Sequence, residues 1–313
     1  MLTIHRWITG VGIRESGELG AGCWANLSEP TPDELTLVTQ TFHLAPTFLT
    51  DPLDKDERAR IEIDEDTNAT LIVLRVPFHD TSLESIPYIT VPLGIIIAAD
   101  AVITVCARRT ALTTEFTDQM RRVCPPTERH RFAFQLLLYA AIIFLRYLRE
   151  ISQHADQIEQ NLHQALRNET LIALLDLQKS MVFFTTSLTA NEMMVGRLAH
   201  MRQLGISETD LDFLDDVDIE FRQALEMATI HSNILTGMMN AYASVISNNL
   251  NRVMKFLTAI TTVLMLPTLV ASIYGMNIIL PFQHHPHAFA ITMGMAFMIS
   301  LLTVLLFIRR KMF

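Results

Sequence analysis

Two long uncharged apolar runs dominate the hydrophobic pattern of the chain. They cover Phe256–Tyr274 and Ala288–Ile308, and neither contains a charged residue. At a rise of about 1.5 Å per residue, a helix of about 20 residues crosses the ~30 Å hydrocarbon core of a bilayer. Two buried core helices are the alternative interpretation, but uncharged runs of this length are typical of membrane spans. Because the join Asn277–His287 is short, the pattern predicts a transmembrane helical hairpin with both ends on one side.

The pattern of the first 126 residues is typical of a mixed α/β domain. Thr70–Phe78 is β-branched and apolar, as in a buried strand, and Tyr88–Arg108 indicates two strands with a turn at Ala99 and Asp100. The stretch TPDE, Thr31–Glu34, is a capping box with proline at the first helical position, so it predicts a helix start. This part contains no glycine-rich phosphate loop and no nucleophile elbow.

A helical period follows from Glu128 to about Met201. It predicts an antiparallel pair of long helices with a break near Asn168, and the apolar stripe indicates packing rather than a ligand site. The stripe consists of Leu145, Leu148, Ile151, Ala155, Ile158, Leu162 and Leu166.

One very long helix is predicted after this pair. The stretch SETD, Ser207–Asp210, is a second capping signal, and between it and Tyr274 the only proline is Pro267 and the only glycine is Gly237. A helix over Glu208–Tyr274 would be about 100 Å long. A helix of that length cannot bury itself within one subunit, so the pattern predicts an oligomer of identical chains.

The formal charge changes sign after Glu226, the last acidic residue. Residues 1–226 hold all 33 acidic residues and 19 of the 24 basic ones, a formal charge of −14. The five remaining basic residues flank the two apolar runs and leave the join without Lys or Arg; they are Arg252, Lys255, Arg309, Arg310 and Lys311. The positive-inside rule therefore places both termini in the cytoplasm and the join outside. No signal peptide is evident at the N-terminus, so we expect a multi-pass protein of the cell (inner) membrane whose acidic part is cytosolic.

Cysteine usage adds little chemistry. Cys23, Cys106 and Cys124 are odd in number, widely spaced and form no C-x-x-C pair, so we expect reduced thiols in the core.

One face of the long helix carries polar and thioether side chains into the first apolar run. Small and hydroxyl residues in a span favour helix contacts or a water-filled lumen over lipid. Packing within the hairpin and the lining of a pore both remain open from the period alone. The face consists of Asn251, Met254, Leu257, Thr261, Met265, Thr268 and Ser272.

Two motifs give this pattern a family resemblance. Asn251–Thr258 is NRVMKFLT and Ile273–Asn277 is IYGMN, ahead of a second span and a basic C-terminus. Together they resemble the CorA family of magnesium channels, tightly over Asp216–Lys311 and mainly in architecture before it. The resemblance implies a homopentameric funnel with an α+β cytosolic domain, long stalk helices and a two-helix transmembrane hairpin. We accordingly divide the chain into a cytosolic α/β domain (1–126), a cytosolic helical pair (127–206), a stalk helix continuing into the first span (207–274), an outer loop (275–287) and the second span with the C-terminus (288–313).

The same resemblance implies that Gly275, Met276 and Asn277 form the ion entrance. Mg²⁺ is small and gives up water reluctantly, and a ring of five Asn277 amides would hold the hydrated ion without stripping it. Gly275 would let backbones approach and the chain turn, and a helix C-cap is the alternative role for Asn277.

Further polar and apolar rings are expected deeper in the pore. Thr268 and Asn251 would form polar rings, while Met254, Leu257 and Met265 would close the pore by excluding water. Pro267 leaves the carbonyl of Val263 without its helical donor.

The outer loop departs from the family pattern. Many members carry acidic residues after Gly-Met-Asn, whereas IILPFQHHPH has none, so we expect weaker electrostatic attraction of cations to the mouth. It carries His284, His285 and His287 instead, which suit Zn²⁺, Ni²⁺ or Co²⁺ better than Mg²⁺. A solvated loop is the simpler interpretation of these histidines.

Six acidic residues between Asp210 and Glu220 are ordinarily a solvated helix face. In the family, a stalk carboxylate meets one from the neighbouring subunit, and Mg²⁺ bridges them to hold the pore shut. Asp216 takes the stalk position, and Asp80, after the strand Thr70–Phe78, best matches the other. Oxygen ligands with retained waters suit such a regulatory metal site.

The sequence thus predicts a divalent-cation channel that conducts Mg²⁺, with Co²⁺ and Ni²⁺ as further candidate ions, and that cytosolic Mg²⁺ gates. Its partners would be copies of itself, membrane lipid and divalent cations, with no organic cofactor. A zinc transporter of the same superfamily, which would carry Gly-Val-Asn, and a non-conducting membrane scaffold or sensor are the alternatives. We do not expect an enzyme, and the acidic charge disfavours nucleic acid as a partner.

Overall fold

The computed structural model describes residues 1–9, 11–80, 86–119, 124–161, 168–201, 205–277, 279–281 and 285–310. The chain divides into two compact units, residues 1–239 and 240–313. The long helix α6 (Glu208–Tyr274) contributes to both units. Its bounds match the single helix of 67 residues expected from the sequence. The five-part division of the chain stays a prediction.

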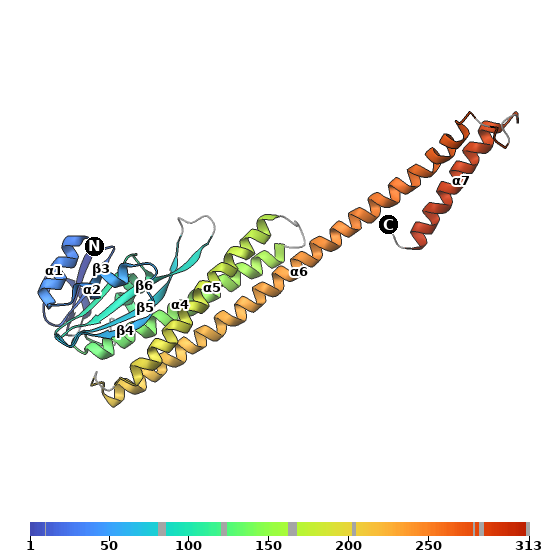
Figure 1. The fold of residues 1–313 in the computed structure, drawn as a ribbon. Coiled ribbons are helices and arrows are strands. Elements are labelled where there is room, and N and C mark those ends of the chain that lie inside the picture. Colours follow the sequence, from blue (N-terminus) through green and yellow to red (C-terminus); the bar gives the residue numbers. More distant parts are fainter. Residues whose placement is uncertain are drawn as a thin grey trace. The chain divides into compact units, whose positions relative to one another are not determined.

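A seven-stranded sheet forms the centre of the first unit (Figure 1). Its order is β2-β1-β3-β7-β6-β5-β4, and only β3 and β7 pair in parallel. The strand predicted at Thr70–Phe78 is β5, and the two predicted within Tyr88–Arg108 are β6 and β7, so these predictions are confirmed. The strands are β1 (Leu2–Ile8), β2 (Gly12–Ser16), β3 (Cys23–Ser28), β4 (Arg60–Ile63), β5 (Thr70–His79), β6 (Tyr88–Ile97) and β7 (Val102–Cys106).

Helices cover both faces of this sheet. On one face, α1 (Pro32–Phe42), α2 (Pro46–Thr50) and the short 3₁₀ helix η1 (Asp51–Leu53) lie against a continuous core. On the other face lie α3 (Ala111–Gln119) and the long pair α4 (Arg129–Asn161) and α5 (Asn168–Ala199). The alternation of side chains along a strand produces both cores.

Strand β3 shows this alternation directly. Trp24 stacks edge-on with Phe116 of α3 and packs on Phe132 of α4, whereas the next residue, Ala25, belongs to the core under α1 and α2. The expected helical pair is confirmed by α4 and α5, although Leu162 and Leu166 of the predicted stripe lie outside the described residues.

Both predicted helix caps form. The Thr31 hydroxyl accepts the Glu34 N–H and the Glu34 carboxylate accepts the Thr31 N–H, which completes the capping box of α1. At the start of α6 the Ser207 hydroxyl accepts the Asp210 N–H at 3.2 Å.

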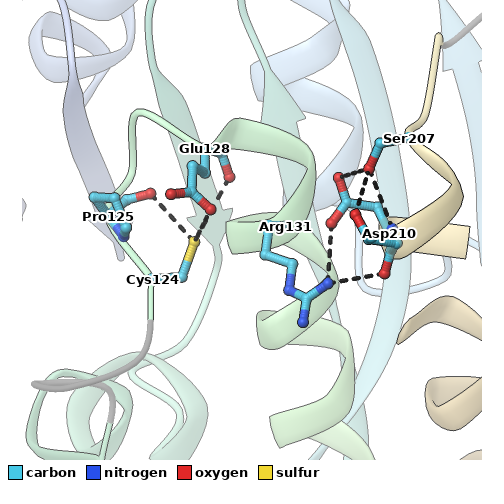
Figure 2. Close-up of polar contacts among 7 residues, drawn as sticks. Cys124, Pro125, Glu128, Arg131, Ser207 and Asp210 are labelled. Atoms are coloured by element: carbon cyan, nitrogen blue, oxygen red, sulfur yellow. Dashed lines mark hydrogen bonds and ion pairs between the residues drawn. The ribbon is translucent and has the colours of Figure 1, made fainter. Parts of the chain in front are cut away.

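Arg131 of α4 holds the start of α6 (Figure 2). Its Nη1 forms an ion pair with Asp210 at 3.1 Å and donates to the Thr209 carbonyl. Its guanidinium also lies over the Phe213 ring. Near it, the Cys124 thiol contacts Pro125 and Glu128, and burial raises the pKa of Cys124 to about 12.

The other two cysteines are also buried. Burial raises the pKa of Cys106 to about 12, and it raises that of Cys23 as well. All three thiols are free and buried, as predicted, and they stay protonated at neutral pH.

The side chain of Asn191 joins α5 to the sheet at the point where β4 stops. The pairing of β4 with β5 ends at Arg60 and Val73, so the main chain of Arg75 lacks a strand partner on that side. Asn191, which is fully buried, supplies one: its Oδ1 accepts the Arg75 N–H at 3.0 Å and its Nδ2 donates to the Arg75 carbonyl at 2.7 Å.

We expect Asn191→Ala to destabilise the protein by about 3 kcal/mol, because two hydrogen bonds are lost and two buried main-chain groups stay unsatisfied. The measurement is the thermal midpoint of the full chain in detergent, which should fall by several degrees. Thr189→Ala, at an exposed position of the same helix, is the matched control and should change the midpoint little. Equal midpoints for the two variants would contradict this role of Asn191.

The second unit pairs the end of α6 with α7 (Ala288–Arg309). Four helices, α4, α5, α6 and α7, are long and apolar enough to cross a membrane, judged from the described residues by length and composition. In α4 67% of the apolar window is buried within the chain, against 6% in α6 and α7. The apolar surface of α6 and α7 is therefore the surface left for lipid or for other subunits.

Candidate functional site

The predicted polar face of α6 points away from α7. Over residues 259–274, the least exposed side chains lie on one side of α6, at 100° per residue, and four of them line a hollow with residues of α7. The least exposed side chains are Ala259, Thr262, Val263, Leu266, Pro267, Val270 and Tyr274. By helical spacing Thr261, Met265, Thr268 and Ser272 lie on the opposite side and are all exposed, and Thr268 also borders the hollow between α6 and α7. Packing within the hairpin therefore does not account for Thr261, Met265 and Ser272, and their face is open to a further partner or to water.

The deeper part of the same face is exposed as well. Asn251, Met254 and Leu257 are exposed, but so are almost all of their neighbours on this stretch of α6. Exposure alone thus does not separate these three from the rest of the helix. They keep the same face as Thr261 and Met265 by helical spacing.

The threonine hydroxyls on this face present oxygen acceptors outward. The Thr268 hydroxyl donates to the Leu264 carbonyl at 3.1 Å, and the Thr261 hydroxyl donates to the Leu257 carbonyl at 2.8 Å. Each proton is used within the helix, so the remaining lone pairs of the hydroxyl oxygen are available. The hydroxyl oxygens of Thr261, Thr268 and Ser272 form a row along this face, which we call the acceptor seam. Such oxygen acceptors suit a cation or the water shell around one.

The Gly-Met-Asn motif lies directly beyond the end of α6. The Gly275 N–H still donates to the Ala271 carbonyl at 2.9 Å, and the Met276 N–H donates to the Ile273 carbonyl at 3.2 Å. Gly275 does not adopt a positive φ, but a Cβ added to it would lie 3.3 Å from the Ala271 carbonyl oxygen, and its expected role in backbone approach and turning stays a prediction. The helical hydrogen bonding continues through Gly275, and the chain leaves the helix after it.

Asn277 is exposed and its side chain makes no hydrogen bond to any described residue. It does not adopt the left-handed conformation of a C-cap either. Its amide is therefore free to bind a ligand, and the alternative of a structural cap has no support in its geometry.

The described part of the outer loop contains His285 and His287. Their rings lie 5.9 Å apart, and the His285 Nδ1 accepts the His287 N–H at 3.2 Å. His284 lies outside the described residues, and within the described ones no group of three or more His, Cys, Asp or Glu side chains is placed to hold a metal ion. The described part of the loop thus offers one imidazole pair, with one ring nitrogen already in use.

The acidic run at the start of α6 alternates between two faces. Leu214, Val217 and Phe221 are buried, while Asp215 and Asp216 are exposed between them. Asp210 and Asp218 have arginine partners, but Asp216 forms no ion pair with any described residue. Its uncompensated charge is available to a cation.

Asp80 lies in a different environment. It follows β5, its N–H donates to the Pro87 carbonyl at 3.0 Å, and it is 7% exposed. The structure does not bring Asp80 and Asp216 together within one chain into a described metal cluster. Burial makes Asp80 the weaker of the two candidates for a metal shared between subunits.

Pattern reasoning missed one group of charged residues in the first unit. Arg58, Arg197 and His200 line a common hollow beside β4. They come from segments far apart in the sequence, so no run or spacing reveals them; only their arrangement in the fold does.

These features define a class of protein. An outward apolar hairpin, an acceptor seam on the side away from the second helix and a free amide at the end of that seam are the parts of a helical membrane transporter. Comparison with known proteins gives the family. The model of the family described as CorA-like Mg²⁺ transporter protein matches residues 20–310, and the chain belongs to this family.

Individual relatives cover nearly the whole chain. The chain is 25% identical to the cobalt/magnesium transport protein CorA of Methanocaldococcus jannaschii, over 91% of this chain and 90% of that protein. It is 23% identical to the protein of the same name from Thermotoga maritima, over 92% of this chain and 82% of that protein. The complete structure of the Methanocaldococcus jannaschii CorA magnesium transporter superposes with a TM-score of 0.85 over 99% of this chain and 98% of that chain, at 23% identity, so the two share the fold.

Proposed function

We propose that this chain forms a Mg²⁺ channel whose pore is lined by the face of α6 opposite α7. The observation that carries the proposal is the exposed acceptor seam of Thr261, Thr268 and Ser272, which leads to the free amide of Asn277. The family membership and the names of the relatives support Mg²⁺ as the conducted ion, with Co²⁺ as a second. Catalysis has no part in this function, and it needs no organic cofactor and no nucleic acid.

A pore of this kind requires several copies of α6 around one axis. We propose five, the number that the family resemblance implies. Large apolar side chains left exposed along α6 support contacts between copies, because exposed apolar surface indicates an interaction site when it recurs along one element. They include Ile219, Ile230, Ile234, Val245, Ile246, Leu250 and Val253.

The same axis would bring equivalent side chains of the five copies together as rings around the pore. Five Asn277 amides would hold hydrated Mg²⁺ at the mouth beside Gly275 and Met276, and Thr268 and Asn251 would contact its water shell deeper in the pore. Met254, Leu257 and Met265 would form apolar rings that exclude water when the pore is narrow.

The orientation follows from the basic residues. Arg252 and Lys255 precede the apolar part of α6, and Arg309 and Arg310 end α7. We propose that these ends lie at the cytoplasmic surface of the cell membrane, that both termini are cytoplasmic and that Asn277 lies outside.

Regulation by cytosolic Mg²⁺ is the last part of the proposal. Asp216, exposed and without an ion-pair partner among the described residues, would share Mg²⁺ with a carboxylate of the neighbouring subunit, for which Asp80 is the candidate. The ion would thus act as both cargo and regulator.

Flux through the purified protein tests the proposed function. Reconstituted in liposomes that contain a Mg²⁺ indicator, the protein should take up Mg²⁺ along its gradient, and its mass in mild detergent should equal five chains. Zn²⁺ uptake without Mg²⁺ uptake would favour the zinc transporter. No flux of either ion from a folded oligomer would favour a non-conducting scaffold.

A further inference from the structure

A hollow of about 990 Å³ lies beside β4 in the first unit, and the proposed pore does not use it. Its volume is at the upper end of the ~300–1,000 Å³ range of small-molecule sites. Residues from β4, from the segment before it and from the end of α5 line it: Arg58, Ala59, Arg60, Ile61, Ala190, Met193, Met194, Gly196, Arg197, His200 and Met201.

The hollow exists because β4 is short and α5 presents small residues to it. Strand β4 pairs with β5 from Arg60 onward, so Arg58 and Ala59 are not held in the sheet. On the opposite wall, a Cβ added to Gly196 would meet no atom within 4 Å. The space is therefore real room beside the helix and not a gap filled by a neighbouring side chain.

The charge of the hollow is opposite to that of the unit around it. Residues 1–226 carry a formal charge of −14, yet the lining contains three arginines, one histidine and no carboxylate. Arg58 and Arg197 are exposed and form no ion pair or side-chain hydrogen bond with any described residue. Two unpaired guanidinium groups thus face a common space.

Two further polar groups on the wall have unused capacity. Arg60 directs Nη2 to Asp51 and Glu62 and Nε to Glu57, but its Nη1 is buried and has no partner among the described residues. The His200 Nδ1 lies 2.8 Å from the Gly196 carbonyl, so Nδ1 carries the proton that is donated there and Nε2 remains available.

The rest of the lining is apolar and adaptable. Met193, Met194 and Met201 lie on the same wall as Arg197, and Ile61 lies on the other. Methionine side chains fit irregular ligands and contact aromatic rings favourably through sulfur. An aromatic ring is thus better suited to this wall than a second charge.

We propose that this hollow binds a nucleoside polyphosphate, with its phosphates on Arg58 and Arg197 and its base on the methionines. Guanidinium groups bind phosphate oxygens through paired, charge-assisted hydrogen bonds. Several cationic groups around one space match a ligand with several negative charges better than they match a ligand with a single carboxylate.

Calorimetric titration of the full chain in detergent with ATP, with EDTA present to remove Mg²⁺, tests the assignment. We expect saturable binding of one ATP per chain, at least tenfold weaker binding of adenosine and of tripolyphosphate, and at least tenfold loss of ATP affinity in Arg197→Gln. Gly196→Phe should abolish binding by filling the hollow, whereas Gly196→Ala should retain it. Arg149→Gln removes an exposed arginine of α4 that does not line the hollow, and should leave the affinity unchanged.

Three results would overturn the assignment. These are no saturable heat from the wild type, equal affinity in wild type and Arg197→Gln, and equal affinity for tripolyphosphate and ATP. Arg197 is exposed and unpaired among the described residues, so its substitution should not unfold the protein, and an unchanged thermal midpoint would verify this. Because the readout is binding without Mg²⁺, a negative result leaves the proposed channel untouched.

Discussion

Asn277→Ala should reduce Mg²⁺ uptake in liposomes to the level of empty liposomes while leaving a folded oligomer. The amide is exposed, forms no hydrogen bond to a described residue and lies where the acceptor seam of α6 ends. Mg²⁺ keeps several waters when it binds, so the proposed ring holds the ion through its water shell, and a methyl group cannot replace that contact. We expect the variant to lose uptake but to assemble normally, because the Asn277 side chain forms no hydrogen bond to a described residue.

Asn249→Ala is the matched control for Asn277. Asn249 is a partly exposed asparagine within α6, and because it lies two residues from Asn251, helical spacing places it away from the proposed pore face. We expect wild-type uptake from this variant. Wild-type uptake from a correctly assembled Asn277→Ala protein would remove the amide ring from the mechanism.

The second large effect concerns Asp216 and the closed state. Two carboxylates about 4 Å apart repel by about 4 kcal/mol at an effective dielectric constant near 20, before screening by salt. A swing of about 5.5 kcal/mol inverts a 1:99 population, so such pairs at five interfaces are sufficient to open a channel when Mg²⁺ leaves. Asp216→Asn removes both the repulsion and the Mg²⁺ ligand. We expect it to blunt the protection that millimolar Mg²⁺ gives the cytosolic unit against protease, while transport is kept.

The control for Asp216 is a carboxylate with the same charge in the same run. Asp212 is exposed and also forms no ion pair with a described residue, so Asp212→Asn changes the net charge equally. It should keep the full Mg²⁺-dependent protection. Asp80→Asn tests the proposed partner in the same assay. If the Asp216 and Asp80 variants are both protected like the wild type, the acidic run is only a solvated face.

Local patterns predicted the long elements of the fold well. The uninterrupted helical period between the Ser207 cap and Gly275 predicted α6, and the β-branched run at Thr70–Phe78 predicted β5. In both cases the signal lies within one segment, in side-chain period and capping chemistry. The polar face of α6 was found for the same reason, although only the position of α7 shows that hairpin packing leaves this face free.

Features that depend on contacts between distant segments were missed. Asn191 completes the hydrogen bonding of β5, and Arg58 meets the same hollow as Arg197, but no sequence spacing links these residues. The burial of Asp80 likewise arises from the packing around the end of β5.

Thiol access from water tests most directly whether the face of α6 opposite α7 lines the pore. Ser272→Cys places a thiol on this face with almost no change in size, and Val270→Cys places one on the side that α7 shields. The native cysteines are buried and their pKa values are raised, so they should stay unreactive. The measurement is Mg²⁺ uptake before and after a cationic methanethiosulfonate reagent. The account predicts that uptake by Ser272→Cys is lost and that uptake by Val270→Cys is kept; unchanged uptake in a labelled Ser272→Cys protein, or loss only in Val270→Cys, would contradict it.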